Sequence, residues 1–346
     1  MTTPLLEVDD LRVRFESDNR TVNAVNGVSF TVFPGEMVGI VGESGSGKTV
    51  TVLSLLGLVP SPPARIVSGR ALFEGRDLLS LDADQLRSIR GSDVAVVFQD
   101  PMTSLNPVIK VGEQLREAMW THARHIDDDL HRARAIELLA LVGIPQPERR
   151  YHQFPHEFSG GMRQRAMIAM AIANRPKLLI ADEPTTALDV TIQAQVLDVL
   201  MAAKAETGAA TVLITHDLGL VAQVADRIAV MYAGRIVEQG TIEDIFLRPS
   251  HPYTIGLLAS LPSIEGRQRR LYSIPGQPPR LDSELEGCSF RPRCAIGSDR
   301  ALCAEEAPNL HTVGDGHRAE CHYVAEAVIW AGERLRDPGA ATGGGR

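Results

Sequence analysis

Apolar and polar residues alternate near the start of the chain, at positions 11–15, where Leu, Val and Phe are separated by arginines. A period of two is typical of a half-buried strand. Residues 27–33 predict a second strand, and residues 37–41 form a short apolar run that leads into a Gly-rich loop. Residues 50–58 then continue as a buried helix. The pattern over residues 1–90 therefore predicts strands and turns around one helix.

Further along the chain, short apolar strands alternate with longer helical segments, which is typical of α/β architecture. The predicted strands are residues 94–98, 178–181, 211–214 and 228–231, and the predicted helices are residues 111–120, 130–142, 162–173 and 190–205. Gly143 is expected as a C-cap of the second helix. The mostly helical stretch at about 100–170 interrupts the alternation, so we expect an inserted helical subdomain.

The composition of the sequence changes near residue 246: proline and arginine become frequent, and the apolar patterns that predict strands become weaker. We expect a core at residues 1–245, a C-terminal extension at residues 246–335, and a flexible Gly-rich tail at residues 336–346. The length of 346 residues fits one large unit plus an extension.

The net charge of −8 argues against DNA or RNA as a partner, since nucleic-acid binders usually present a basic face. No apolar run approaches the ~18 residues needed to span a bilayer. The acidic start, MTTPLLEVDD, lacks the cationic region of a secretory signal. We therefore expect the chain to stay in the cytosol and to act at a membrane only through partner chains.

The segment Gly42-Glu43-Ser44-Gly45-Ser46-Gly47-Lys48-Thr49 fits the phosphate-loop pattern G-x-x-x-x-G-K-[ST], and it lies between a predicted strand and a predicted helix. Backbone N–H groups of such a loop curl around phosphate oxygens, and the helix N-terminus adds partial positive charge. Lys48 is expected to reach the β- and γ-phosphates and Thr49 to bind Mg²⁺. The pattern predicts a nucleoside-triphosphatase; a chance Gly-rich turn is the alternative.

Two acids, Asp182 and Glu183, end the apolar strand at residues 178–181. They should emerge at the carboxyl edge of the sheet, beside the phosphate loop. There Asp182 would hold Mg²⁺ and Glu183 would act as general base on the attacking water. Without the phosphate loop, a solvated acidic pair at a strand end would explain them equally well.

The segment Phe158-Ser159-Gly160-Gly161-Met162-Arg163-Gln164-Arg165 resembles the signature of the ABC ATPase family, LSGGQ in its commonest form. In this chain Phe158 takes the place of the Leu of the common signature and Met162 takes the place of its final Gln, but the Ser-Gly-Gly core is intact. Ser159, Gly160 and Gly161 would form a second anion cradle at a helix start. The resemblance implies that this cradle binds the γ-phosphate of ATP held by another subunit. A plain helix N-cap is the alternative.

Other family elements follow in the same order along the chain. Gln99 resembles the Q-loop glutamine that touches Mg²⁺ and water, and Ala187-Leu188-Asp189 resembles the D-loop at the dimer seam. His216 resembles the switch histidine that contacts the γ-phosphate, although a lone His at a strand end is more often structural. Phe15 resembles the aromatic residue that stacks on adenine, with an ordinary core residue as the alternative.

The resemblance implies a RecA-like P-loop core with an antiparallel β subdomain and the inserted helical subdomain. It also implies an ATPase in which two subunits close on ATP and open after hydrolysis, a two-state switch biased by ligand. The helical subdomain would pass this motion to membrane subunits.

Two segments indicate which branch of the ABC ATPase family the chain resembles. Gln99-Asp100-Pro101-Met102-Thr103-Ser104-Leu105-Asn106-Pro107 resembles the Q-loop of oligopeptide and dipeptide importers, and Ser250-His251-Pro252-Tyr253-Thr254 resembles the opening of their C-terminal extension. This resemblance implies a related second ATPase subunit, two permeases, an extracytoplasmic substrate-binding protein, and a place at the cytoplasmic face of the membrane. Import of nickel or another small solute is an alternative, and a soluble ABC ATPase acting on nucleic acid is another.

The chain has four cysteines, all in the extension: Cys288, Cys294, Cys303 and Cys321. Clustered cysteines in a reducing cytosol indicate metal or catalysis before disulfides. Their spacing is not the C-x₂-C of zinc ribbons, and four thiolates suit zinc or a [4Fe–4S] cluster. Similar cysteine sets in peptide-importer ATPases resemble iron–sulfur sites, which favours the cluster. Unliganded thiols or two disulfides remain open, and His311, His317 or His322 could replace a cysteine.

Overall fold

The computed structural model describes residues 3–17, 20–123, 125, 127–186, 189–261, 272–282 and 286–335. The predicted tail at residues 336–346 lies outside these residues, as do Ala187 and Leu188 of the predicted D-loop.

A large mixed sheet forms the centre of the molecule, with the strand order β11-β12-β10-β9-β3-β8-β7-β6. Its central strands run parallel: β3 (Met37–Val41) pairs with β8 (Ala210–Thr215) and β9 (Arg227–Tyr232), and β7 (Leu178–Asp182) pairs with β8 and with β6 (Val94–Val97). Every residue of β3 and β7 is buried. Continuous apolar strands of this kind need cover on both faces, so the predicted α/β core is confirmed.

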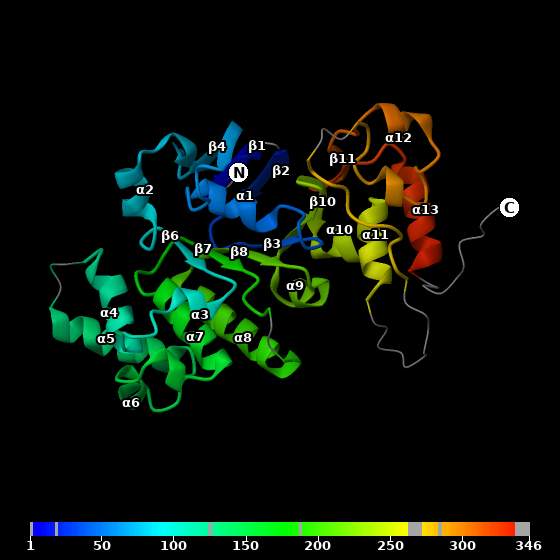
Figure 1. Ribbon diagram of the computed structural model, residues 1–346. Helices are drawn as coiled ribbons and strands as arrows, with labels where there is room; N and C mark the ends of the chain where they lie inside the picture. Colours follow the sequence, from blue (N-terminus) through cyan, green and yellow to red (C-terminus); the bar gives the residue numbers. More distant parts are fainter. Residues whose placement is uncertain are drawn as a thin grey trace.

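Two hydrophobic clusters cover the two faces of this sheet, because its side chains alternate between them. Val38 and Ile40 of β3 pack with α1 (Lys48–Leu55) on one face. Met37 and Val41 join a cluster with helices on the other. Those helices are α7 (Gly160–Ala171), α8 (Val190–Thr207) and α9 (Leu218–Val224). Figure 1 shows α1 above the sheet and α7, α8 and α9 below it.

A second, antiparallel sheet of order β2-β1-β4-β5 packs into the same cluster as α1. Its strands are β1 (Leu6–Ser17), β2 (Arg20–Val32), β4 (Ala64–Phe73) and β5 (Arg76–Asp77). The predicted alternation in β1 is confirmed, since Leu11 and Val13 are buried and Arg12 is exposed. β4 was not predicted, because six exposed residues in a row give it no alternation.

The predicted single helix in residues 1–90 is wrong, because α2 (Ala83–Ile89) is also present. Asp82 caps this helix by accepting from the N–H groups of Asp84 and Gln85, and the Gln85 side chain accepts from the N–H of Asp82. This capping box has a recognisable pattern in the sequence and could have identified the helix.

Residues 101–171 are mostly helical, as predicted, and include α3 (Pro101–Ser104), α4 (Val111–Trp120), α5 (Asp128–Leu141) and α6 (Pro147–Tyr151). α4 has the predicted bounds. α5 begins two residues before the predicted start because Asp127 caps it, accepting from the N–H of Asp129. The C-cap of α5 is Val142, one residue before the predicted Gly143, which follows it with a left-handed φ of 72°.

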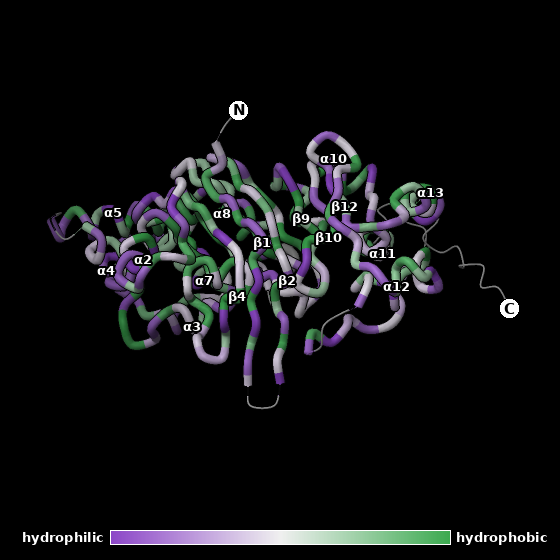
Figure 2. The backbone as a smooth tube through the Cα atoms, turned by 90° about the horizontal axis from the view of Figure 1, so that it is seen from above, coloured by the Kyte–Doolittle hydropathy of each residue, from purple (hydrophilic) through white to green (hydrophobic). Residues whose placement is uncertain are grey.

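The extension is built onto the main sheet, which corrects the expectation that strands fade after residue 246. β12 (His317–Ala319) pairs with β10 (Arg235–Thr241), and β11 (His311–Gly314) pairs with β12. The helices after β10 are α10 (Ile242–Leu247), α11 (Pro252–Ala259), the short 3-10 helix η3 (Arg291–Arg293), α12 (Ala301–Glu305) and α13 (Val324–Arg334). Figures 1 and 2 show the extension and the helical insertion on opposite sides of the core.

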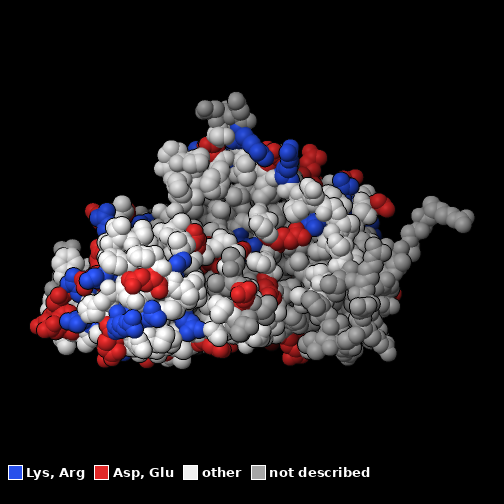
Figure 3. Space-filling model, turned by 60° about the horizontal axis from the view of Figure 1, so that its bottom comes forward, with Lys and Arg blue, Asp and Glu red and all other residues white. Residues whose placement is uncertain are grey.

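The underside of the molecule carries charges of both signs. In the described part of that face, Lys and Arg side chains lie among Asp and Glu side chains over the helical insertion (Figure 3). No helix among the described residues is long and apolar enough to cross a bilayer.

Packing at α4 leads to a test of the fold. A Cβ added at Gly112 would lie 2.2–2.5 Å from ring atoms of the buried Tyr151. Helix propensity alone favours Gly→Ala, but overpacking costs about 1–3 kcal/mol. Gly112→Ala should therefore lower the thermal unfolding temperature. Gly332→Ala in α13 is the matched control, because a Cβ there meets nothing within 4 Å; it should raise that temperature slightly. A higher unfolding temperature for Gly112→Ala would contradict the packing.

Candidate functional site

A cavity of about 760 Å³ opens at the carboxyl edge of the parallel strands. It is lined by the phosphate loop together with residues from other predicted motifs: Gly42, Ser44, Gly45, Gly47, Lys48, Thr49, Gln99, Glu183 and His216. The structure thus brings together residues that are up to 174 positions apart in the sequence, counted from Gly42 to His216.

The phosphate loop connects β3 to α1 and needs glycine where it passes close to other backbone. A Cβ at Gly42 would lie 2.1 Å from the carbonyl oxygen of Met231, and one at Gly47 would lie 2.4 Å from the carbonyl oxygen of Ala24. Gly47 also has a left-handed φ of 100°. Only glycine tolerates both constraints, which fits its place in the pattern.

Lys48 is the first residue of α1, and its side chain is only 4% exposed. Its Nζ donates to the carbonyl oxygens of Gly42 (2.8 Å) and Glu43 (3.0 Å) and lies 3.9 Å from Glu183 Oε1. Burial lowers the pKa of Lys48, while the nearby carboxylates of Glu183, Asp182 and Glu43 raise it. The ammonium group is therefore held inside the loop by carbonyl oxygens and by opposite charge.

Asp182 ends β7 and is buried beside the phosphate loop. The Thr49 hydroxyl donates to Asp182 Oδ1 over 2.8 Å. Burial raises the pKa of Asp182, and this hydrogen bond opposes the rise. A hydroxyl and a carboxylate in contact are oxygen donors of the kind that Mg²⁺ binds in nucleotide sites.

The Glu183 carboxylate lies close to residues of two other predicted motifs, Gln99 and His216. Its Oε2 lies 3.3 Å from Gln99 Nε2, 3.4 Å from His216 Nδ1 and 2.8 Å from the Thr186 hydroxyl. Its backbone has a left-handed φ of 43°, which is uncommon for a residue with a side chain. Residues in such conformations cluster at functional sites, where the surrounding structure holds them.

The signature residues are not among those that line this cavity. Ser159, Gly160 and Gly161 are exposed or partly exposed at the start of α7. The Ser159 hydroxyl accepts from the N–H of Met162 over 3.3 Å, so Ser159 is the N-cap of this helix. Asp189 is exposed and precedes α8.

Phe15 is also not among the lining residues, and it packs against the cluster beneath the antiparallel sheet. Its neighbour on β2, Val22, lines the cavity instead. The role of Phe15 in stacking on adenine stays a prediction.

Sequence reasoning missed several lining residues, and two of them come from beyond residue 246. Leu257 lies on α11, and Leu281 reaches the cavity beside β2, where its carbonyl oxygen accepts from the N–H of Asn23 over 2.8 Å. Nothing in the sequence around these leucines indicates a nucleotide site. Val22, Ala24 and Thr186 were missed as well.

The four cysteines form no disulfide, and Cys303 and Cys321 are buried. The Cys288 N–H donates to the Cys303 carbonyl over 2.9 Å, and a Cβ at Gly297 would lie 2.9 Å from Cys303 Sγ and 3.6 Å from Cys294 Sγ. Burial raises the pKa of Cys288 to about 11 and of Cys321 to about 12, with nearby thiols adding to the rise.

These thiols do not form a recognisable metal site. In the described part of the chain, no group of three or more His, Cys, Asp or Glu side chains is arranged to hold a metal ion, so the expected metal-binding extension is not supported. The three nearby histidines contact other groups: His311 the carbonyl of Asn309, His317 the carboxylate of Glu238, and His322 the carbonyl of Glu306.

Comparisons with known proteins agree with this geometry. The ABC transporter family matches residues 25–186, and the oligopeptide/dipeptide transporter C-terminal region matches residues 237–303. The chain is 51% identical over 91% of its length to the oligopeptide transport ATP-binding protein OppD of Bacillus subtilis, covering 87% of that protein. It is 49% identical over 92% of its length to the dipeptide transport ATP-binding protein DppD of the same organism, covering 94% of that protein.

Among solved structures, a dimeric ATP-binding cassette bound to ADP and Pi superimposes with a TM-score of 0.61 at 25% identity, covering 68% of this chain and 98% of that one. The chain therefore belongs to the ABC transporter family, as an ATP-hydrolysing ATP-binding protein that carries the oligopeptide/dipeptide transporter C-terminal region.

Proposed function

We propose that this chain powers the uptake of dipeptides or oligopeptides by an ABC importer, through ATP hydrolysis at the cavity around Glu183. The observation that carries the proposal is the convergence of Lys48, Gln99 and His216 on that carboxylate. The peptide part rests on the C-terminal region and on relatives of about the same length that are named for peptide transport.

Each residue of the cavity would have a distinct part in hydrolysis. The loop glycines and serines present N–H groups to the phosphates, and Lys48 leaves its carbonyl partners for the β- and γ-phosphates. Thr49 and Asp182 would hold Mg²⁺, which neutralises charge on the phosphates. Glu183 would take a proton from the attacking water, while Gln99 and His216 orient that water and the γ-phosphate.

A second ATPase subunit would complete each site. Ser159, Gly160 and Gly161 are accessible at a helix N-terminus that carries partial positive charge, so they can face the γ-phosphate of ATP bound to a partner chain. Asp189 would lie at the same seam. Two permeases and an extracytoplasmic binding protein would supply the path and the substrate, and this chain would lie at the cytoplasmic face of the membrane.

The role of Glu183 can be tested with Glu183→Gln. This change keeps the shape of the side chain and removes the base, so ATP turnover should fall at least about 100-fold while ATP binding persists. Turnover is measured as phosphate release and binding by titration. Glu137→Gln is the control, because that side chain is 66% exposed on α5. Near-normal turnover in Glu183→Gln would exclude Glu183 as the base.

The substrate class can be tested in cells that lack this chain. Uptake of labelled dipeptides and oligopeptides should be lost, should return with the wild-type chain, and should not return with Lys48→Ala, which removes the phosphate-binding cation. Lys204→Ala on α8 is the control and should restore uptake. Loss of nickel uptake with peptide uptake intact would instead favour the small-solute alternative.

We also propose that Cys288, Cys294, Cys303 and Cys321 hold a [4Fe–4S] cluster in preference to zinc. Four thiols are a common ligand set for such clusters. Zinc needs four ligands within about 2.3 Å of one point, whereas a cluster of four irons accepts thiols that lie farther apart. Cys294 and Cys303 both lie beside Gly297, and the Cys288 N–H donates to the Cys303 carbonyl, so at least three of the four cysteines lie close together.

Protein purified without oxygen should show a band near ~400 nm and contain about four irons and four sulfides per chain. Cys303→Ser should lower the iron content, and His322→Asn should not, because His322 contacts the Glu306 carbonyl. One zinc and no colour would support the zinc alternative, and the absence of both metals would contradict both assignments.

A further inference from the structure

The turn between Cys288 and Cys294 reaches the phosphate loop through one arginine. Arg293 is only 5% exposed, and its guanidinium makes a bidentate ion pair with Glu43: Nη1 lies 2.6 Å from Oε2 and Nη2 lies 2.9 Å from Oε1. The two residues are 250 positions apart, and Glu43 directly follows Gly42 in the phosphate loop. Paired N–H···O bonds of this kind fix orientation as well as distance.

The arginine is held in place by its surroundings. Its Nε donates to the Pro275 carbonyl over 3.0 Å, and its guanidinium lies 5.7 Å from the centre of the Tyr232 ring. Phe290, from the same turn, packs against the rings of Tyr232 (5.2 Å) and Tyr253 (5.4 Å). Burial lowers the pKa of Arg293, but the hydrogen bonds to Glu43 more than offset this and raise it. The guanidinium therefore stays charged.

A second contact from the extension fixes the backbone of the same residue. The Glu43 N–H donates to the Tyr253 hydroxyl oxygen over 2.9 Å, and Tyr253 is fully buried at the start of α11. The Tyr253 N–H in turn donates to His251 Nδ1 over 3.0 Å. Burial lowers the pKa of His251 to about 3, so its ring is neutral and can accept this bond.

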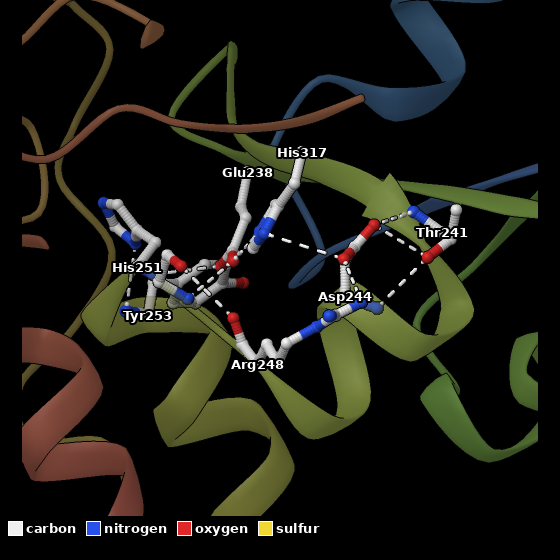
Figure 4. Close-up of polar contacts among 8 residues, drawn as sticks. Glu238, Thr241, Asp244, Arg248, His251, Tyr253 and His317 are labelled. Atoms are coloured by element: carbon white, nitrogen blue, oxygen red, sulfur yellow. Dashed lines mark hydrogen bonds and ion pairs between the residues drawn. The ribbon is translucent and has the colours of Figure 1, made fainter. Parts of the chain in front are cut away.

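The start of α11 is anchored to the main sheet. Glu238 of β10 accepts from the N–H groups of Ser250 (2.6 Å) and His251 (3.0 Å) and contacts His317 of β12 over 2.8 Å. Figure 4 shows Glu238 between His251 and His317, with Tyr253 beside it. Glu238 therefore helps to position the start of α11, and with it the Tyr253 hydroxyl, from the side of the main sheet.

These contacts act on the part of the phosphate loop that holds Lys48. The carbonyl oxygens of Gly42 and Glu43 accept from Lys48 Nζ, so fixing Glu43 also fixes the place of that ammonium group. Glu43 is one of the residues that line the cavity where the nucleotide phosphates would bind. Unpaired, its charge would repel them; paired with Arg293, it is neutralised.

We propose that Arg293 is a positioning residue for nucleotide binding: it neutralises Glu43 and holds the phosphate loop ready for the phosphates, so the cysteine turn sets nucleotide affinity. This inference rests on the proposed ATP site. It assigns a role in the ATPase reaction to a residue of the extension, far from the ABC motifs in the sequence.

A double-mutant cycle of Glu43 and Arg293 tests the inference on the full-length chain. The measured quantity is the Kd for Mg²⁺-ADP, a ligand that is not hydrolysed. Arg293→Gln leaves the Glu43 carboxylate unpaired and should raise the Kd about tenfold. The double variant Glu43→Gln/Arg293→Gln removes that charge and should recover most of the loss. Arg291→Gln, in the same turn and with the same change of charge, is the matched control and should leave the Kd unchanged.

Steady-state ATPase kinetics separate positioning from a general structural role. Arg293→Gln should raise the KM for ATP while kcat at saturating ATP stays within about twofold, because the lost interaction serves binding. Arg293→Lys keeps the charge without the bidentate fork and should fall between the wild-type chain and Arg293→Gln. If Arg293→Gln does not fold, Arg293→Lys decides: a Kd equal to that of the wild-type chain would overturn the proposal.

Two other results would overturn the proposal. One is an unchanged Kd in Arg293→Gln. The other is a double variant that binds as weakly as the single variant, which would make Arg293 merely structural. If instead the wild-type chain binds no nucleotide, the proposed ATP site itself fails. The two failures are therefore distinguishable.

Discussion

The site depends on one constraint, that neighbouring parallel strands end at the same edge of a sheet. The order β3-β8-β7-β6 places β7 between the strands that precede His216 and Gln99. Adjacent strands are about 4.8 Å apart, so side chains leaving β8 and β6 can reach a residue at the end of β7 from both sides. Glu183 occupies that central place, and this explains why its carboxylate contacts both.

Buried charge makes this arrangement responsive to its ligand. Lys48 lies among the carboxylates of Asp182, Glu183 and Glu43, and burial disfavours the charged forms of Lys48 and Asp182. A triphosphate adds further negative charge, so it can bind only if cations accompany or meet it. Mg²⁺ beside Thr49 and the ammonium group of Lys48 would meet that need. Arg293, which is not a lining residue, offsets the negative charge of Glu43 in the same way.

Much of the core could be predicted from the sequence because its signals are local. The buried runs of β3 and β7, the Gly-rich loop and the exact bounds of α4 follow from residues close together in the chain. β4, with its exposed side chains, and β12, with three residues, are held by pairing with distant strands. The place of Leu281 at the cavity and the pairing of Arg293 with Glu43 were missed for the same reason, since Leu281 bonds Asn23 and both partners are more than 200 positions away.

The extension differs from an appended domain because it shares structure with the core at three levels. β12 adds to β10 of the main sheet, α11 contributes Leu257 to the nucleotide cavity, and the cysteine turn pairs with the phosphate loop. The strand pairing and the Arg293–Glu43 pair are hydrogen-bonded, so breaking either one leaves polar groups unpaired at a cost of about 1–3 kcal/mol. The cysteine turn reaches the phosphate loop by two routes, because Arg293 pairs directly with Glu43 and Phe290 packs against Tyr253, whose hydroxyl accepts from the Glu43 N–H.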